Sequence, residues 1–234
     1  MKIAISQPTF LPWQGYMALL NYVDEFIILD NVQFDKRSWQ QRNKIKQNNK
    51  ELLITIPVKT KNKYHQKINE VEINYNLNFT EKHLKSIYLS YKKSKFFNSY
   101  FKKIEDIYNK KFNNLIDLNL SFLNLFKSEI EIETKMSFVS ELKLDKNKHE
   151  LIDKVCNIKK CDRYISSVGA ENYLEKLKSK KLNYQIEYFD FKNIKYSQLG
   201  NKFLPFLSFL DLLFNLGKDS KLYLEKNIFI LKNK

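Results

Sequence analysis

The fold of this chain is decided by the stretch Lys2-Ile-Ala-Ile-Ser-Gln-Pro-Thr-Phe-Leu-Pro-Trp-Gln-Gly-Tyr16. Its apolar beginning predicts a short buried strand over residues 2–6, its prolines predict a turn, and a helix is expected from about 15 to 23. A second apolar run, 26–29, ends at Asp30. Strand, loop, helix and strand in this order are typical of a βαβ unit, and open α/β sheets bind ligands at the carboxyl ends of such strands. The sequence therefore predicts an α/β fold with a Rossmann-like, mostly parallel sheet.

A helical middle and a C-terminal segment complete the predicted fold. From about residue 80 to 128, apolar side chains recur at helical spacing with lysines on the other face, which indicates amphipathic helices. Further strands are expected at 51–58, 67–73, 130–134, 163–167 and 185–189. Further helices are expected at 148–156, from 167–170 through 180, and at 203–214, the last with Gly217 as its cap. Because no internal repeat or Pro/Gly/Ser-rich linker divides the chain, we expect a single domain over residues 1–234.

The composition predicts a folded, cytoplasmic protein. Hydrophobic residues make up 43% of the chain and aromatic residues 15%, which supports a sizeable core. No apolar run approaches the roughly 18 to 20 residues that cross a bilayer, and no secretory signal is recognisable. Cys156 and Cys161 lack the second cysteine pair or clustered histidines of a zinc site. We predict no metal site and no cofactor.

The net charge of +15 favours an anionic partner such as nucleic acid, a nucleotide or a membrane surface. Nearly all the basic residues are lysines, so the codon usage of an AT-rich genome explains the charge equally well. Arginine is the better bidentate ligand for phosphate, and the chain contains only Arg37, Arg42 and Arg163. Each arginine is therefore a candidate for specific anion binding.

The loop after the first predicted strand supplies two candidate binding residues, Gln7 and Gln14. Pro8 and Pro12 stiffen this loop, and Gly15 permits a close approach before the helix begins. Amide side chains both donate and accept hydrogen bonds, which suits a base, an amide or a sugar hydroxyl. The alternative is a well-made turn without a ligand.

The loop after the second predicted strand is Asp30-Asn-Val-Gln-Phe-Asp-Lys-Arg-Ser-Trp-Gln-Gln-Arg-Asn43, a polar run of both signs around one tryptophan. Arg37 and Arg42 are candidates to hold a phosphate or a carboxylate, and Asp30 is a candidate general base. The other candidate binding residues of this run are Gln33, Trp39 and Asn43. A solvated, salt-bridged loop is the alternative, although such a loop has no need of Trp39.

Further candidates lie later in the chain. His83 stands at helical spacing from Ile87 and Tyr91, and is either a general acid or base or a half-buried helix residue. Ser167 and Gly169 lie between a predicted strand and a predicted helix, which is the layout of a phosphate or carboxylate nest. Polar groups near the last helix are individually uninformative; they are Tyr196, Gln198, Asp211 and Asn215.

Four spaced patterns in this chain closely resemble the WbqC-like family. They are Gln-Pro-x-Phe-x-Pro-Trp-x-Gly-Tyr, Asp-x-Val-Gln-Phe-x-Lys-Arg-x-Trp-x-x-Arg-Asn, His-x-x-x-Ile-x-x-x-Tyr and Ser-x-Gly-Ala. The resemblance covers nearly the whole chain and implies an association with bacterial O-antigen and other surface-polysaccharide gene clusters. It also implies site residues at the matching positions, namely Gln7, Pro8, Gly15, Asp30, Gln33, Arg37, Trp39, Arg42, Asn43, His83, Tyr91, Ser167 and Gly169.

A fainter likeness concerns nucleotidyltransferases and ligases with an HxGH signature. The order of strand, Trp-Gln-Gly-Tyr loop, helix and strand is similar to the start of that fold. Trp13 and Tyr16 stand in place of the two histidines. Adenylyl transfer through those histidines is therefore not expected, even on a shared fold.

The polysaccharide setting implied by the resemblance requires enzymes that build nucleotide-linked sugars. We expect a transferase that forms an amide on a nucleotide-linked amino sugar, with an aminoacyl group such as glycyl, or an acyl group, as donor. His83 or Asp30 would assist deprotonation of the amine, while the two loop arginines hold the pyrophosphate. An aminoacyl-tRNA donor would give the basic charge a purpose. The alternatives are nucleotidyl transfer on the same fold and a non-catalytic factor that binds a carbohydrate or a polyprenyl phosphate.

Overall fold

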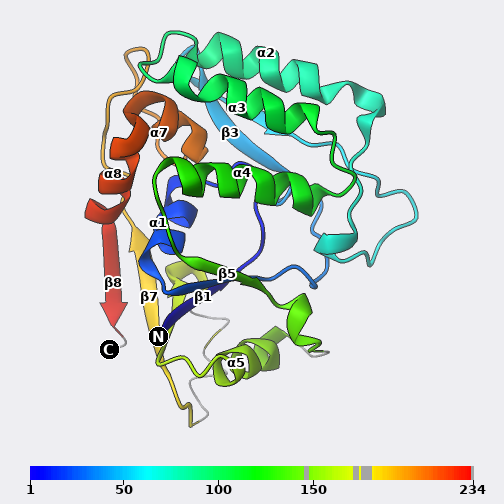
Figure 1. The fold of residues 1–234 in the computed structure, drawn as a ribbon, viewed down its shortest axis with the longest axis vertical. Coiled ribbons are helices and arrows are strands. Elements are labelled where there is room, and N and C mark those ends of the chain that lie inside the picture. The colour runs from blue at the N-terminus through cyan, green and yellow to red at the C-terminus, as the bar shows by residue number, and fades with distance from the viewer. Residues whose placement is uncertain (145–147, 171–173, 175–180, 233–234) are drawn as a thin grey trace.

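The computed structural model describes residues 1–144, 148–170, 174 and 181–232, and a six-stranded sheet lies at its centre (Figure 1). The strand order is β5-β2-β1-β6-β7-β8, and every neighbouring pair is parallel except β7 with β8. The predicted α/β fold with a mostly parallel, Rossmann-like sheet is therefore confirmed. The strands are β1 (Lys2–Ser6), β2 (Glu25–Ile28), β5 (Lys135–Phe138), β6 (Arg163–Ser167), β7 (Gln185–Phe191) and β8 (Ile228–Lys232).

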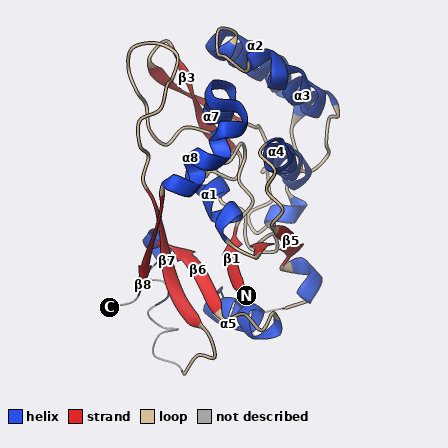
Figure 2. Ribbon diagram, turned by 60° about the vertical axis from the view of Figure 1, so that its left-hand side comes forward, coloured by secondary structure: helices blue, strands red, loops and turns tan. Residues whose placement is uncertain are grey.

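Helices cover both faces of this sheet. The helices are α1 (Gln14–Tyr22), α2 (Phe79–Tyr91), α3 (Phe97–Asn109), α4 (Leu115–Glu129), α5 (Lys148–Ile158), α7 (Phe209–Leu216) and α8 (Ser220–Lys226). Figures 1 and 2 show α5 on one side of the sheet and α2, α3 and α4 on the other. Because side chains alternate along a strand, Ile3 and Ile27 belong to the smaller core on the α5 side, whereas Ala4 and Phe26 belong to the larger core.

A separate two-stranded hairpin lies outside the main sheet. It consists of β3 (Arg42–Gln47) and β4 (Lys50–Thr55), joined by Asn48 and Asn49. Both asparagines have positive φ, 48° and 60°, as tight hairpin turns require, and asparagine tolerates this backbone well. Because α2 and α7 both contact β3, the hairpin links the helical layer to the loops at the carboxyl edge of the sheet.

Several elements differ from those predicted. Residues 67–73 form a 3-10 turn (Ile68–Glu70) with isolated bridges instead of a strand. The strand expected at 130–134 lies later, at Lys135–Phe138, where it pairs with β2. The sequence also gives no sign of β3, because Arg-Asn-Lys-Ile-Lys-Gln lacks the apolar alternation of a half-buried strand. The final strand β8 is a further addition.

The helix predicted at 203–214 begins later, at Phe209. Phe206 has a positive φ of 57°, which is incompatible with a helix, and the Ser208 hydroxyl accepts a 3.2 Å hydrogen bond from the Leu210 amide as a cap. Gly217 ends the helix, as predicted. The helix predicted through residue 180 falls almost wholly outside the described residues.

Candidate functional site

The loops after β1 and β2 are joined by side-chain and backbone hydrogen bonds. The Gln40 amide donates to Gln7 Oε1 at 2.8 Å, and the Phe10 main-chain amide donates to the Trp39 carbonyl at 3.0 Å. Asn43 Nδ2 donates to the carbonyls of Phe10 and Leu11, at 3.1 and 2.8 Å. The loops after β1 and β2 therefore form one unit at the carboxyl edge of the sheet, where proteins of this fold class bind their ligands.

This unit carries a hollow of about 220 Å³, which we call the aromatic pocket. The Trp13 and Phe206 ring centroids lie 5.9 Å apart, and half of Trp39 is exposed. Exposed aromatic faces beside a few polar groups suit a flat ring or the apolar face of a sugar. The pocket is lined by Thr9, Trp13, Trp39, Asn43 and Phe206.

Gly15 makes room for one wall of the pocket. A Cβ at residue 15 would lie 2.1 Å from the nearest atom of the Trp13 indole, far inside van der Waals contact. The close approach expected at this glycine is therefore made by the Trp13 side chain, which folds back over the first turn of α1. A larger residue at position 15 would displace the indole.

Several polar atoms of these loops are buried and lack a hydrogen-bond partner in the described part of the chain, and two of them lie in the aromatic pocket or next to one of its lining residues. They are Thr9 Oγ1, in the aromatic pocket, and Arg42 Nε, on the residue before Asn43. A buried donor or acceptor without a partner costs about 1–3 kcal/mol, so such atoms are sites where a ligand or water gains a hydrogen bond. Asn43 differs, because both hydrogens of its amide already bind main-chain carbonyls.

A buried polar network lies behind the pocket, around the fully buried Asp211 carboxylate. Tyr196 and Gln198 donate to Asp211 Oδ2, at 2.5 and 3.0 Å, and Gln14 donates to the Tyr196 hydroxyl at 3.2 Å. Burial raises the pKa values of both Asp211 and Tyr196. Gln14 is completely buried and its amide braces this network, so its predicted contact with substrate stays a prediction.

The network extends to Lys46 on β3, which is only 4% exposed. Its ammonium donates to the Gln198 Oε1 oxygen at 3.4 Å and to the Lys202 carbonyl. Burial lowers the Lys46 pKa, and attraction to Asp211 opposes that shift. The Lys46 main-chain amide also donates to the Tyr91 hydroxyl at 3.0 Å, so Tyr91 is buried in the network.

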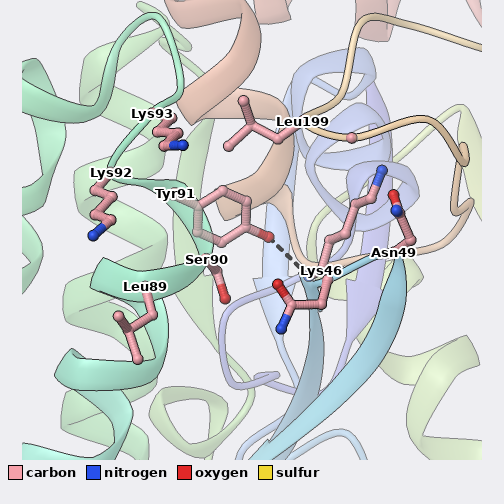
Figure 3. A pocket seen from close by; sticks show the side chains of 10 residues that line it. Lys46, Asn49, Leu89, Ser90, Tyr91, Lys92, Lys93 and Leu199 are labelled. Carbon is pink, nitrogen blue, oxygen red and sulfur yellow. Dashed lines mark hydrogen bonds between the residues drawn. The ribbon is translucent and has the colours of Figure 1, made fainter.

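Lys46 and Tyr91 help to line a second, larger hollow of about 390 Å³, which we call the cationic cavity (Figure 3). It opens between the β3–β4 turn, the end of α2 and the loop around Gly200. Asn49 Oδ1 fastens that loop by accepting from the amides of Asn201 and Lys202, at 3.2 and 3.4 Å. The lining residues are Lys46, Asn48, Asn49, Leu89, Ser90, Tyr91, Lys92, Lys93, Leu199 and Gly200.

His83 is buried in an aromatic cluster rather than presented to either hollow. Its Nδ1 lies 3.1 Å from the Tyr108 hydroxyl, and its ring packs against Phe10 and Phe79. Burial lowers its pKa to about 4. The helical spacing that places Ile87 in the core also turns His83 inward, so its position favours a packing role over the predicted catalytic one.

Asp30 is likewise buried and already hydrogen-bonded. Its carboxylate accepts from the Ser140 main-chain amide at 3.0 Å and from the Asn69 amide at 3.5 Å. These bonds connect the end of β2 to the segment after β5 and to the 3-10 turn. The geometry therefore gives Asp30 a clear structural role, while its predicted role as a base stays a prediction.

The remaining candidates lie apart from the aromatic pocket. Arg37 is an exposed turn residue with a φ of 60°, fixed by its main-chain amide donating to Gln41 Oε1 at 3.0 Å. Gln33 is exposed and donates to the Tyr64 carbonyl at 3.1 Å. Ser167 and Gly169 are exposed after β6. Of the predicted cleft residues Asp30, Arg37, Trp39, Arg42 and His83, Trp39 lines the aromatic pocket, and none of the other four lines either of the two hollows in the described part of the chain.

A model of the WbqC-like protein family matches residues 7–223, which include both loops and both hollows. The chain belongs to the WbqC-like family. This WbqC-like chain is 33% identical over 225 residues to the uncharacterized protein Rv1507c of Mycobacterium tuberculosis, an alignment covering 95% of this chain and 97% of the relative. No solved structure matches it significantly. In the described ranges, the WbqC-like chain has no helix long and apolar enough to cross a bilayer.

Sequence reasoning missed Lys46, Asn49 and the assembly around Asp211. Lys46 stands in a polar run that resembles any exposed segment, and its partner Gln198 is 152 positions away in the WbqC-like chain. Tyr196, Gln198 and Asp211 are visible as polar groups near one helix, but only the tertiary fold joins them. The one available signal was the two lysines and three asparagines in the segment from Asn43 to Asn49.

Proposed function

We propose that this WbqC-like protein is a transferase that forms an amide on a nucleotide-linked amino sugar, using an activated aminoacyl or acyl donor. The aromatic pocket is the observation that supports this proposal best. Trp13, Trp39 and Phe206 offer aromatic faces, and Thr9 offers a hydroxyl that no residue of the described structure pairs with, which together suit a sugar ring. The pocket lies at the carboxyl edge of a parallel sheet, where this fold class binds nucleotides.

The proposed reaction joins the amine nitrogen of the sugar to the carbonyl carbon of an ester or thioester donor. The carbon–nitrogen bond forms as the donor's carbon–oxygen or carbon–sulfur bond breaks, and the amine proton leaves with the departing alcohol or thiol. As far as the structure describes the chain, the residues lining the aromatic pocket include no carboxylate and no imidazole. Positioning of amine and donor, rather than a base in this pocket, is therefore the contribution we assign to the protein.

An aminoacyl-tRNA is the form of donor that fits the charge of the chain. With 41 basic and 26 acidic residues, the surface attracts a polyanion, and phosphate contacts would supply a salt-dependent affinity. The proposal predicts that aminoacylated tRNA is consumed and that uncharged tRNA is released. An acyl thioester is the alternative donor.

A non-catalytic sugar-binding factor is the second candidate, because the same pocket binds a sugar without requiring turnover. Nucleotidyl transfer is less well supported. Tyr16, which stands in place of the second HxGH histidine, is buried, and burial raises its pKa strongly. A buried, neutral phenol cannot take over the role of an exposed histidine that binds a phosphate.

The decisive experiment incubates the protein with nucleotide-linked amino sugars and, separately, with aminoacyl-tRNA and acyl thioesters. Mass spectrometry of the nucleotide sugar should show the added aminoacyl or acyl mass. Trp39→Ala should abolish the product, whereas Tyr64→Ala, an exposed aromatic outside the pocket, should not. Binding of the sugar without any mass increment would support the binding factor and contradict the transferase.

A further inference from the structure

The cationic cavity combines one buried lysine with two exposed ones. Lys46 rises from β3 along one wall, and Lys92 and Lys93 follow the end of α2 on the other (Figure 3). Lys92 Nζ lies 5.5 Å from the centroid of the Tyr88 ring, so its charge is partly directed along the helix. No acidic residue is among the described residues that line the cavity. The lining therefore favours an anion.

The Lys46 ammonium has donor capacity left for a ligand. An ammonium carries three N–H groups, and the hydrogen bonds to Gln198 and to the Lys202 carbonyl occupy two of them. Asp211 is the acidic group that faces Lys46 from within the protein, and its Oδ2 already accepts from Tyr196 and Gln198. Lys46 is thus held in place by fixed polar partners, and no hydrogen bond within the described ranges occupies its third N–H.

Ser90 provides an independent sign of a ligand in the cavity. Its Oγ is buried and has no hydrogen-bond partner among the residues that the structure describes. A hydroxyl in this state would donate a hydrogen bond to an anion that enters the hollow. The side chains of Asn48 and Asn49 add amide groups at the opposite rim.

We propose that the cationic cavity binds the phosphate groups of a small phosphate ester, with Lys46 as the buried charge, Lys93 as the outer charge and Ser90 as a hydrogen-bond donor. A cavity of about 390 Å³ has the volume of a small-molecule site, with room for a diphosphate and part of the group it carries. Lysine binds phosphate as a point charge and does not need the bidentate geometry of arginine. This assignment stands whether or not the protein acylates a sugar.

The cavity is close to the aromatic pocket along one strand. Lys44 Nζ lies 6.0 Å from the centroid of the Trp39 ring, and Lys46 is two residues further along β3 on the same side. Two residues of extended strand span roughly 7 Å. The strand β3 therefore connects a lysine beside Trp39 to the buried lysine of the cationic cavity.

The first test is a calorimetric titration of the full chain with inorganic pyrophosphate. We expect saturable binding that Lys46→Met weakens by about tenfold to a hundredfold, as expected for a lost hydrogen bond to a charged group. Lys93→Ala should weaken it several-fold and Ser90→Ala about tenfold. Lys82→Ala removes one exposed lysine from the same helix outside the cavity and should leave the affinity unchanged.

Several outcomes would overturn the assignment. One is pyrophosphate binding that is equal in the wild type, Lys93→Ala and Ser90→Ala, two changes outside the Asp211 network that remain informative even where Lys46→Met does not fold. Another is an equal loss in Lys82→Ala, which would show general attraction to a basic surface. Binding of tRNA that pyrophosphate does not displace, with no pyrophosphate binding, would assign the charge to RNA instead.

Two further sets of measurements identify which kind of phosphate compound binds in the cavity. They also distinguish this inference from the proposed reaction. A nucleoside diphosphate that binds more tightly than pyrophosphate would extend the site to a nucleotide, whereas preference for vesicles containing a lipid phosphate would assign it to a lipid headgroup. Pyrophosphate binding that depends on Lys46 and Lys93 supports the cavity even when no amide product forms. Amide formation in a protein whose pyrophosphate binding is indifferent to Lys93→Ala and Ser90→Ala supports the reaction and contradicts the cavity.

Discussion

Asn43 donates a 2.8 Å hydrogen bond to the carbonyl of Leu11, a residue whose φ is +43°. A second bond from the same amide reaches the Phe10 carbonyl at 3.1 Å. A leucine in the left-handed region is strained, and it persists only where its surroundings fix it. Asn43 thus holds the first loop in the shape that carries Thr9 and Trp13 into the aromatic pocket.

We predict that Asn43→Ala destabilises the protein by about 2–4 kcal/mol, because two buried carbonyls lose their donor. The free energy of unfolding from urea titrations would measure this loss. Asn98→Ala is the matched control, since Asn98 is exposed on α3 and its replacement should change stability little. Equal stability of Asn43→Ala and the wild type would show that these bonds do not hold the loop.

The pairing of the two loops was predictable, but the composite site was not. The apolar runs that end at Ser6 and Ile28 predict adjacent parallel strands, and adjacent strands bring the loops that follow them together. The position of His83 depends instead on which face of α2 packs against Phe10, a contact between residues 73 positions apart. Helical spacing alone predicts which face of α2 is buried, but it does not predict which residues of other elements pack against that face.

The cationic cavity, in contrast, could not be predicted from the sequence at all. Lysine is usually exposed, so a lysine in a polar run indicates surface. Lys46 is buried because Tyr91, Gln198 and the Lys202 carbonyl surround it, and these come from distant segments. Nothing local to β3 specifies that environment, so the cavity emerges only from the folded chain.

Gly15→Ala should disrupt the aromatic pocket more than the fold. The added methyl would overlap the Trp13 indole, which must then swing away from its position beside Phe206. We expect the tryptophan emission spectrum to shift and the affinity for a nucleotide-linked sugar to fall by about tenfold or more. The helix itself should tolerate alanine, the better helix former.

Gly169→Ala is the control for that substitution, because a Cβ at residue 169 meets no atom within 4 Å. It should leave both fluorescence and stability unchanged. It also tests the predicted nest, since a ligand seated against the Gly169 backbone would be displaced by the methyl. A loss of sugar-nucleotide binding in Gly169→Ala alone would therefore return Ser167 and Gly169 to the site.

The pH dependence of stability should report the burial of His83. Its folded pKa, lowered to about 4, lies below its ordinary value of 6.5, so between these values the unfolded chain binds a proton that the folded protein does not. Stability from the neutral imidazole is thus complete above about pH 6.5 and is lost as the pH falls towards 4. The loss amounts to about 3 kcal/mol.

Urea unfolding at pH 7.5 and 5.0 would measure this effect, with His83→Gln compared with the wild type. The variant should be less stable at pH 7.5 and should lose less stability on acidification. His65→Gln, at an exposed position, should behave like the wild type. If His83→Gln instead keeps the wild-type stability at both pH values but loses turnover, His83 is catalytic and its packing role is wrong.

Tyr196→Phe should weaken the network beneath the cationic cavity. The change removes the 2.5 Å hydrogen bond to Asp211 and leaves the buried carboxylate with one donor fewer. We expect a destabilisation of about 1.5–3 kcal/mol. Tyr75→Phe is the control, since its hydroxyl donates to the Phe112 carbonyl at a partly exposed site, and its loss should be smaller. Thermal unfolding of both variants would give the comparison.

Arg42 and Arg37 should differ in their contribution to ligand binding, although the sequence gives both the same role. Arg42 lies next to Asn43 on β3, and its Nε is buried without a partner in the described residues, so a ligand anion in the neighbouring pocket would satisfy it. Arg37 is exposed on a turn that its main chain already fixes, so solvent screens its charge. We therefore expect Arg42→Gln to weaken nucleotide-sugar binding by about 1.5–3 kcal/mol, and Arg37→Gln by less than about 1 kcal/mol. Calorimetric titration of the two variants checks this order, and a larger loss in Arg37→Gln would place the ligand at the turn instead of along β3.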